Sequence, residues 1–290
     1  MAESIYQIYD KIFKKILTLS SKAVINLING LFDTEYPTDS EITYNWTEFE
    51  DDELRKVLAD TIITINGCHC YHMEAQMTID EDIIFRVFDY GYQHACRNNQ
   101  KEKDSCCLVF PEPKIIYLCA DNSMPEQYTL KLDFRNQGYF EYKVSVLNYQ
   151  EISMEELNNK KMVILIPFSL LRLRNALKRD RTPEKLFQLK TLIQDGIIGS
   201  INKNVKVGNI TPEDARRLYR LTHKLYDHLY AHYSEMEELN EMTDESLMLD
   251  IDIIEKEHEK ELEEKDRIIA ELEKQVIDLK KQIEENKLNS

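Results

Sequence analysis

Two stretches rich in β-forming residues, joined by a tight turn, constrain the fold of this 290-residue chain more than any other feature. Residues 55–65 and 68–77 flank Asn66-Gly67, a dipeptide typical of β-hairpin turns because both residues readily adopt positive φ angles. One arm carries an acid, Asp60, and the other carries Glu74-Ala75-Gln76. These polar residues are either solvent-facing positions on an ordinary hairpin or part of a metal site.

The number of residues in the turn decides whether the two acids share a face of the sheet, because side chains alternate along a strand. A two-residue Asn66-Gly67 loop would place Asp60 and Glu74 on opposite faces. A three-residue loop, such as Ile65-Asn66-Gly67, or a bulge would place both acids on one face together with Gln76. A metal site on this hairpin therefore predicts an odd loop or a bulge.

The order of predicted elements favours an α/β fold. Residues 4–32 show apolar positions at helical spacing, residues 42–49 read as a strand, and the hairpin follows. A helix capped by Asp80 is expected over residues 80–97, and a buried strand after Pro113. The apolar run over 161–168 is either a strand or the start of a helix, and helix caps are expected at Ser20-Ser21, Thr182 and Thr211. Helix, strand, strand, strand, helix, strand is the order on which metal-dependent nucleases of the restriction-endonuclease type are built. The predicted fold is a restriction-endonuclease-like mixed sheet flanked by helices.

Short motifs in the same order strengthen this prediction. The chain opens with Asp10-Lys11-Ile12-Phe13-Lys14, continues with a strand that contains Asp60, and reaches Glu74-Ala75-Gln76 on the next strand. A helix with Arg86 and aromatic residues follows. Over roughly residues 5–170, the chain resembles the Rpn-type putative transposases, recombination-promoting nucleases within the PD-(D/E)xK superfamily. The resemblance implies a metal-dependent DNA endonuclease associated with recombination or mobile elements.

The resemblance also implies roles for individual residues. Asp60 and Glu74 would hold Mg²⁺ or Mn²⁺, the Ala75 carbonyl would add a third oxygen, and Gln76 would orient the attacking water. Mg²⁺ prefers such oxygen ligands. Glutamine replaces the lysine usual at that position, and it keeps a donor and an acceptor but brings no positive charge. Asp10 either completes the acidic cluster or lies on a polar helix face.

Two other kinds of site are weighed for the same strand. Cys68, Cys70 and His72 alternate on one face with Glu74, which suggests zinc, but structural zinc sites usually take Cys-x₂₋₄-Cys pairs from two elements. A Cys–His nucleophile would need a helix N-terminus or a cation beside Cys68 or Cys96 to lower the thiol pKa, and the sequence supplies neither. Half-buried reduced thiols are the simpler interpretation.

Charge is distributed unevenly along the chain. The formal net charge is −16, yet residues 231–290 hold 20 acidic and 8 basic side chains, whereas residues 170–230 hold 13 basic and 6 acidic ones. The basic segment is either a solvated surface or a contact for DNA phosphates. The candidate phosphate contacts are Arg172, Arg174, Lys178, Arg179, Arg181 and Lys185.

The C-terminal part differs from the rest. Leu262, Ile269, Val276 and Ile283 recur every seven residues, which predicts either a short coiled coil that forms a homo-oligomer through residues 262–283 or a solvated helical tail. The expected organisation is a nuclease-like domain over 1–170, a helical region over 171–235 and an acidic coiled-coil tail over 236–290.

The expected location is the cytoplasm, because no long apolar run or signal-peptide pattern occurs and six Cys in a chain of this length favour reduced thiols. No contact with a membrane is expected. Two functions remain open from the sequence: a Mg²⁺-dependent endonuclease acting on DNA, and a catalytically inactive nuclease-derived scaffold that acts through its coiled coil.

Overall fold

The structure, a computed structural model, describes residues 5–50, 56–101, 103–119, 124–233, 267–269 and 272. For residues 5–8, 10, 45–50, 56–61, 100 and 101 it describes the backbone and not the side chains. The predicted coiled coil over 262–283 therefore falls almost wholly outside the described residues.

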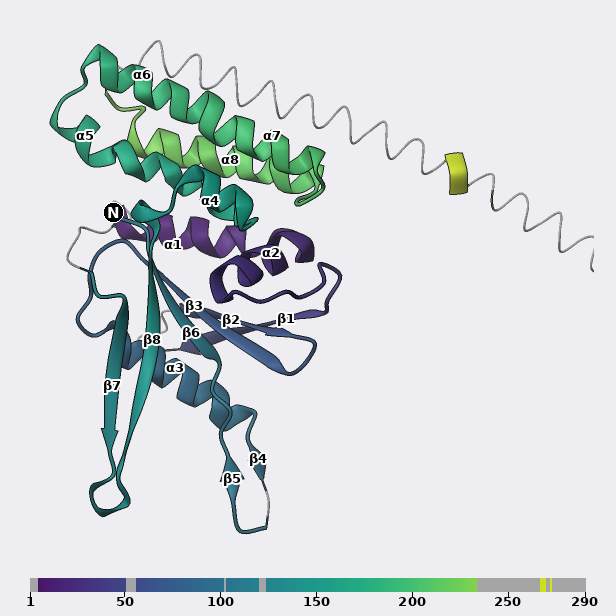
Figure 1. The fold of residues 1–290 in the computed structure, drawn as a ribbon, viewed down its shortest axis with the longest axis vertical. Coiled ribbons are helices and arrows are strands. Elements are labelled where there is room, and N and C mark those ends of the chain that lie inside the picture. The colour runs from purple at the N-terminus through teal and green to yellow at the C-terminus, as the bar shows by residue number, and fades with distance from the viewer. Residues whose placement is uncertain are drawn as a thin grey trace, which may run out of the picture.

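The chain forms a mixed β-sheet with helices on both faces (Figure 1). The strands are β1 (Ile42–Glu50), β2 (Lys56–Ile65), β3 (His69–Gln76), β4 (Gln100–Lys101), β5 (Cys106–Cys107), β6 (Glu112–Tyr117), β7 (Gln127–Asp133) and β8 (Tyr139–Asn148). The α-helices are α1 (Ile5–Ile16), α2 (Ser21–Phe32), α3 (Ile83–Arg97), α4 (Met154–Asn159), α5 (Arg174–Arg179), α6 (Pro183–Thr191), α7 (Gly199–Lys206) and α8 (Pro212–Leu229). The α/β prediction is confirmed.

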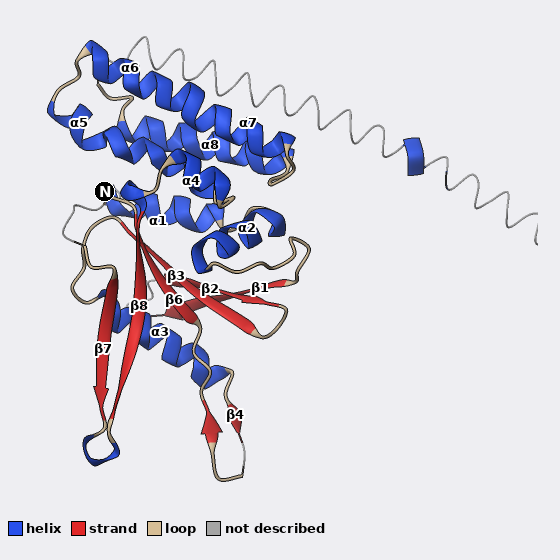
Figure 2. Ribbon diagram, in the orientation of Figure 1, coloured by secondary structure: helices blue, strands red, loops and turns tan. Residues whose placement is uncertain are grey.

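Six strands form the main sheet in the order β1-β2-β3-β6-β8-β7. The first three are an antiparallel meander, β6 and β8 join in parallel after crossovers, and β7 closes the edge antiparallel to β8. The strands β4 and β5, which the sequence did not predict, pair as a separate short hairpin. Figure 2 shows this hairpin and the β7–β8 hairpin projecting away from the helical layer.

The loop between β2 and β3 has an odd number of residues, as a metal site on this hairpin requires. Ile65 pairs with His69 and Thr61 with Met73, so the loop consists of residues 66–68. Asn66 and Gly67 take φ angles of 51° and 68°, which this dipeptide tolerates. The odd loop is confirmed, although it lies one residue later than the 65–67 example.

One face of the sheet is covered by a thick helical layer. The apolar face of α1 and α2 packs there with side chains of β2 and β3, such as Ile63 and Met73. The apolar run predicted as strand or helix start is a buried 3₁₀-helix, η3 (Val163–Leu173), which lies at the centre of this layer. Residues 171–233 pack on the same cluster, so the predicted boundary at 170/171 falls inside η3.

Predicted capping residues begin several of these helices. Ser20 caps α2 by accepting a hydrogen bond from the Ala23 amide. Thr211 begins α8 with a reciprocal capping box to Asp214, and Thr182 precedes α6, each with proline at the first helical position. A π-helical segment, η4 (Leu192–Ile198), joins α6 to α7.

The other face of the sheet is covered by α3. The side chains of Ile83 and Val87 on α3 pack against Ile115 and Tyr117 of β6 and Val144 of β8 in a small second cluster. Among the described residues, no helix is long and apolar enough to cross a membrane.

Candidate functional site

Glu74 lies near the end of β3 on the face that α3 covers. It pairs with Ile115, a member of the small cluster beneath α3, and its neighbour Met73 belongs to the thick core on the opposite face. Only 5% of Glu74 is exposed. A carboxylate buried to this extent is costly unless partners compensate its charge, so its contacts matter for what the site can do.

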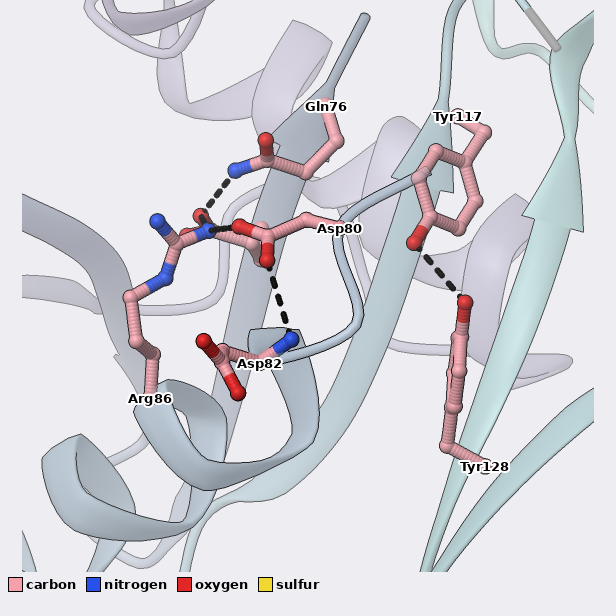
Figure 3. A network of polar contacts seen from close by, with 7 residues as sticks. Gln76, Asp80, Asp82, Arg86, Tyr117 and Tyr128 are labelled. Carbon is pink, nitrogen blue, oxygen red and sulfur yellow. Dashed lines mark hydrogen bonds and ion pairs between the residues drawn. The ribbon is translucent and has the colours of Figure 1, made fainter. Parts of the chain in front are cut away.

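One oxygen of Glu74 has partners from two elements, β3 and α3. Figure 3 shows Gln76, Asp80 and Arg86, which take part in this network. Oε1 accepts a hydrogen bond from Nε2 of Gln76, two residues later on the same strand face. Nη2 of Arg86, on the first turns of α3, lies 3.4 Å from the same oxygen. The same nitrogen forms an ion pair of 3.0 Å with Oδ2 of Asp80. Arg86 therefore bridges two carboxylates.

The loop between β3 and α3 holds Asp80 in place. Oδ1 of Asp80 accepts a hydrogen bond of 2.9 Å from the backbone amide of Asp82, the residue directly before α3. The sequence predicts Asp80 as the helix cap. In the structure α3 begins after Asp82, and Asp80 contributes a local turn and a carboxylate facing Arg86.

The second oxygen of Glu74, Oε2, is buried and has no hydrogen-bond partner among the described residues. The Nε of Arg86 is likewise buried without a described acceptor. An unsatisfied buried carboxylate oxygen favours a cation or a proton, and an unsatisfied guanidinium nitrogen favours an anion or a water molecule. The two atoms together suit a ligand that brings both charges, such as a divalent cation with a phosphate.

Asp60 lies on β2, near the point where pairing with β3 ends. The described pairs between β2 and β3 end at Thr61 and Met73. Continuing the same register by one residue would place Asp60 opposite Glu74. On its other side β2 is irregular, because Trp46 pairs with Thr61 and Glu48 with Leu58, so two β2 residues, Ala59 and Asp60, stand opposite one residue of β1. The Asp60 side chain lies outside the described residues.

The carbonyl of Ala75 points away from β6, the strand that pairs with this part of β3. The backbone oxygen of Gln76 accepts from the Leu118 amide at 2.8 Å, so the main-chain groups of Gln76 point to β6 and those of Ala75 point toward β2. The described β2–β3 pairing ends before Ala75. Its carbonyl is therefore placed beyond the paired part of the hairpin.

Asp10 belongs to α1, and α1 packs on the thick core across the sheet from Glu74 (Figure 1). The Asp10 side chain lies outside the described residues. The structure thus brings Glu74 and Gln76 into direct contact and places the Asp60 backbone near them. It puts the helix that carries Asp10 on the other face.

A second pair of polar side chains lies further along the same face. His72 of β3 contacts the ring of Tyr90 on α3, and His94 is buried one turn later on that helix. Burial, followed by the proximity of His72 and Arg97, lowers the pKa of His94 below its usual value. Burial thus disfavours the charged form of His94, and its side chain packs within this face.

The alternative zinc site finds little support in the described geometry. Cys68 is exposed in the turn, and Sγ of Cys70 lies 3.3 Å from the Thr64 hydroxyl. Among the side chains that the structure describes, no group of three or more His, Cys, Asp or Glu is placed to hold a metal ion. A metal site at Glu74 would thus depend on Asp60, whose side chain falls outside that description.

The predicted phosphate contacts lie on the helical layer, away from Glu74 (Figure 1). Arg172 donates a hydrogen bond to the carbonyl of Ile152, and its guanidinium lies 5.4 Å from the centre of the Tyr149 ring. Arg174 lies 5.8 Å from the ring centre of Tyr9. These two arginines hold η3 and α5 against their neighbours.

The remaining basic residues divide into two kinds. Arg181 donates to the Leu177 carbonyl at 2.9 Å, and Lys185 pairs with Asp180. Lys178 and Arg179 are exposed on α5. Structural contacts thus account for four of the six residues. The segment does not border the Glu74 site, because the sheet separates them.

The sequence did not single out the ion pair of Arg86 with Asp80. Asp80 was interpreted as a helix cap and Arg86 only as part of a helix shared with similar proteins. The available signal was an acid in the short loop before a helix, followed by an arginine within the first turns of that helix.

Comparison of the chain with protein-family models, curated protein sequences and solved structures finds no match.

Proposed function

We propose that this protein is a Mg²⁺- or Mn²⁺-dependent nuclease that hydrolyses phosphodiester bonds in DNA, with a restriction-endonuclease-like domain as its catalytic part. The observation that carries this proposal is the buried Glu74 carboxylate, with one oxygen held by Gln76 and Arg86 and the other without a described partner. A buried acidic side chain with a specific charge partner is a candidate functional group.

The arrangement of elements supports the proposal. Helix α2, the meander β1-β2-β3, helix α3 and the parallel strand β6 follow in the order expected for such a nuclease. Glu74 lies on the central strand β3, and the odd loop gives Asp60 and Glu74 the same parity along the hairpin. A matching element order supports a fold by analogy, so the residues themselves must carry the function.

Each residue has a role that its chemistry allows. Glu74, Asp60 and the Ala75 carbonyl would hold the cation through oxygen atoms, which Mg²⁺ prefers. The bound ion would supply charge stabilisation for the transferring phosphate and activate water. Gln76 would orient that water through its amide. Arg86 would exchange its contact with Glu74 for the phosphate, which its guanidinium binds well.

The partner we propose is DNA, bound through its phosphates and associated with recombination or mobile elements. Lys178 and Arg179 are the exposed members of the predicted basic set, and because the sheet separates them from Glu74 they would contact DNA phosphates outside the stretch that is cut. Such contacts give affinity that falls with salt and carries little sequence preference. Self-association through residues 262–283 belongs to the same proposal.

The decisive experiment is a cleavage assay with a matched acid as control. Supercoiled plasmid is incubated with the full chain and Mg²⁺ or Mn²⁺, beside Asp60→Ala, Glu74→Ala and Glu81→Ala. Glu81 is an exposed acid in the loop after β3, so its loss changes the charge without touching the site. We expect metal-dependent nicking by the wild type and by Glu81→Ala, and none by the other two.

Isothermal titration of the same four proteins with Mn²⁺ separates binding from catalysis. Binding that is lost in Asp60→Ala and Glu74→Ala supports the metal site. The proposal fails if the wild type neither binds Mn²⁺ nor nicks DNA.

The second candidate is a nuclease-derived scaffold without catalysis. It is favoured by one observation: Gln76 and Arg86 already occupy one oxygen of Glu74, and no lysine stands at the position of Gln76. The scaffold predicts Mn²⁺ binding without nicking, or neither, together with self-association of the full chain.

A further inference from the structure

The strand β7 ends the main sheet and leaves one of its sides open. In the described part of the chain, β7 pairs with β8 on one side and with no strand on the other. Figure 2 shows the β7–β8 hairpin extending beyond the helices. An edge strand of seven residues with open main-chain groups is a template for pairing with another strand.

The hydrogen bonds to β8 identify which main-chain groups of β7 point outward. The Phe134 amide donates to the Gly138 carbonyl, and the Val146 amide donates to the Glu126 carbonyl. Even-numbered residues of β7 therefore bond to β8, because bonding alternates along an antiparallel pair. The N–H and C=O groups of Thr129, Lys131 and Asp133 point to the open side.

The side chains of β7 form one apolar and one polar face. Tyr128, Leu130 and Leu132 are half-buried on the α3 side, where Tyr128 and Leu130 pack on the small core cluster. Phe134 follows the strand and is 55% exposed, as are its hairpin neighbours Tyr139 and Phe140 to a similar extent, so the end of this hairpin is rich in exposed aromatic side chains. Thr129, Lys131 and Asp133 are exposed on the other face.

We propose that β7 pairs antiparallel with β7 of a second copy of this chain, with a two-fold axis at Leu132. Lys131 of each copy then stands opposite Asp133 of the other, and these outward-pointing residues exchange main-chain hydrogen bonds. Leu132 meets its own copy, and Leu130 covers the exposed Phe134. Opposite charges and apolar pairs directly across strands each stabilise a sheet.

The neighbouring registers are less favourable. An axis at Lys131 would set two ammonium groups directly opposite each other, which destabilises a strand pair. An axis at Leu130 would pair Lys131 with Thr129 and Asp133 with Gln127, without a charge pair, and would leave Phe134 beyond the paired strand. Of these registers, only the axis at Leu132 pairs Lys131 with Asp133 and also covers Phe134.

The symmetry also fits the rest of the molecule. Direct opposition of same-face residues requires a two-fold axis perpendicular to the sheet. Both α3 helices then lie on one side of a continuous sheet, and both α8 helices lie on the other. The C-terminal ends of both α8 helices therefore lie on the same side of the joined sheet, which is compatible with the self-association predicted for residues 262–283.

Disulfide trapping tests the interface independently of the tail. In the proposed pairing Leu132 and its copy form a non-hydrogen-bonded pair, whose Cα atoms lie about 4.5 Å apart, a separation that a disulfide can bridge. The full-length variants Leu132→Cys, Leu130→Cys and Thr129→Cys are oxidised beside the wild type, which reports the background from the native cysteines. The covalent dimer is measured on non-reducing gels.

We expect several-fold more covalent dimer from Leu132→Cys than from the wild type or Thr129→Cys. Thr129 lies on the same strand but far from its copy in this register. Equal yields in Leu132→Cys and Thr129→Cys overturn the proposal, and the highest yield in Leu130→Cys overturns its register. Neither result depends on metal binding or nicking, so the test is separate from that of the nuclease.

Charge reversal gives a second test. Asp133→Lys places two lysines opposite each other at both ends of the pair, so it should lower the yield of the Leu132→Cys dimer several-fold. Asp104→Lys, a charge reversal at an exposed acid in the loop between β4 and β5, should not. An unchanged yield in Asp133→Lys contradicts the proposed pairing.

Discussion

The two faces of the sheet differ in what covers them. The face toward α1, α2, η3 and α8 carries a large apolar cluster drawn from most of the chain. The face toward α3 carries a small apolar cluster, and beside it lie the buried polar side chains His72, Glu74 and His94. The thick face supplies most of the apolar burial, which leaves the thin face free to hold groups that are costly to bury.

The largest expected effect compares the same truncation on the two faces. Ile28 of α2 and Ile83 of α3 are both fully buried helical residues. Ile28→Ala should lower the free energy of unfolding by about 4–5 kcal/mol and Ile83→Ala by about 2–3 kcal/mol, because the thin layer can relax into the cavity. Urea unfolding measures both, and equal losses would contradict the contrast between the faces.

The next effect concerns a polar group inside the thick core. The Tyr149 hydroxyl donates to the Leu165 carbonyl at 2.8 Å and lies 2.9 Å from the Ser169 hydroxyl. Burial raises the pKa of Tyr149 to about 12, so the group is neutral at ordinary pH. Tyr149→Phe should cost about 1–3 kcal/mol, since it leaves buried partners unsatisfied. A thermal melt that matches the wild type would show that the core adjusts without this hydroxyl.

A smaller effect of opposite sign is expected at Glu74. Glu74→Gln removes a buried charge whose second oxygen has no described partner, and it keeps an amide that can bond to Gln76. The free energy of unfolding should rise by up to about 1 kcal/mol while metal binding is lost, because the buried charge is removed and Arg86 keeps its ion pair with Asp80. Parallel urea unfolding and Mn²⁺ titration check both. A clear loss of stability would indicate that Glu74 is a structural partner of Arg86.

The smallest effect is a pH dependence from the thin face. Because the pKa of His94 is lowered in the folded state, the unfolded chain binds more protons as the pH falls below about 6.5. Stability should therefore fall as the pH drops through that range and stay constant above it. His94→Asn should reduce this slope in urea unfolding between pH 5 and 7.5. An unchanged slope would show that titratable groups other than His94 cause the pH dependence of stability.

Much of the local structure was predictable from the sequence because it depends on local chemistry. Asn66 and Gly67 specify the hairpin turn, Ser20 and Thr211 specify helix starts, and alternation specifies the strands. The apolar run at η3 was ambiguous, since a continuous apolar segment has no period that separates a strand from a helix. Its helical form follows from burial on every side.

The contacts of the candidate site are also only partly predictable from the sequence. Glu74 and Gln76 share a strand face by alternation, so their contact follows from the sequence once the register is known. The bridge from Arg86 to Glu74 and Asp80 could not be predicted, because it depends on the angle at which α3 crosses the sheet.

By itself, the sequence determined most of the elements, their order and the position of the hairpin turn, because turns, caps and alternation act over a few residues. The length of the turn, and with it the parity of the hairpin, was decided by the structure. Tertiary structure alone decided which face of the sheet became the thick core, and it placed the basic segment on that side, away from Glu74. The physical reason is that burial depends on how distant segments pack together, and no short segment contains that information.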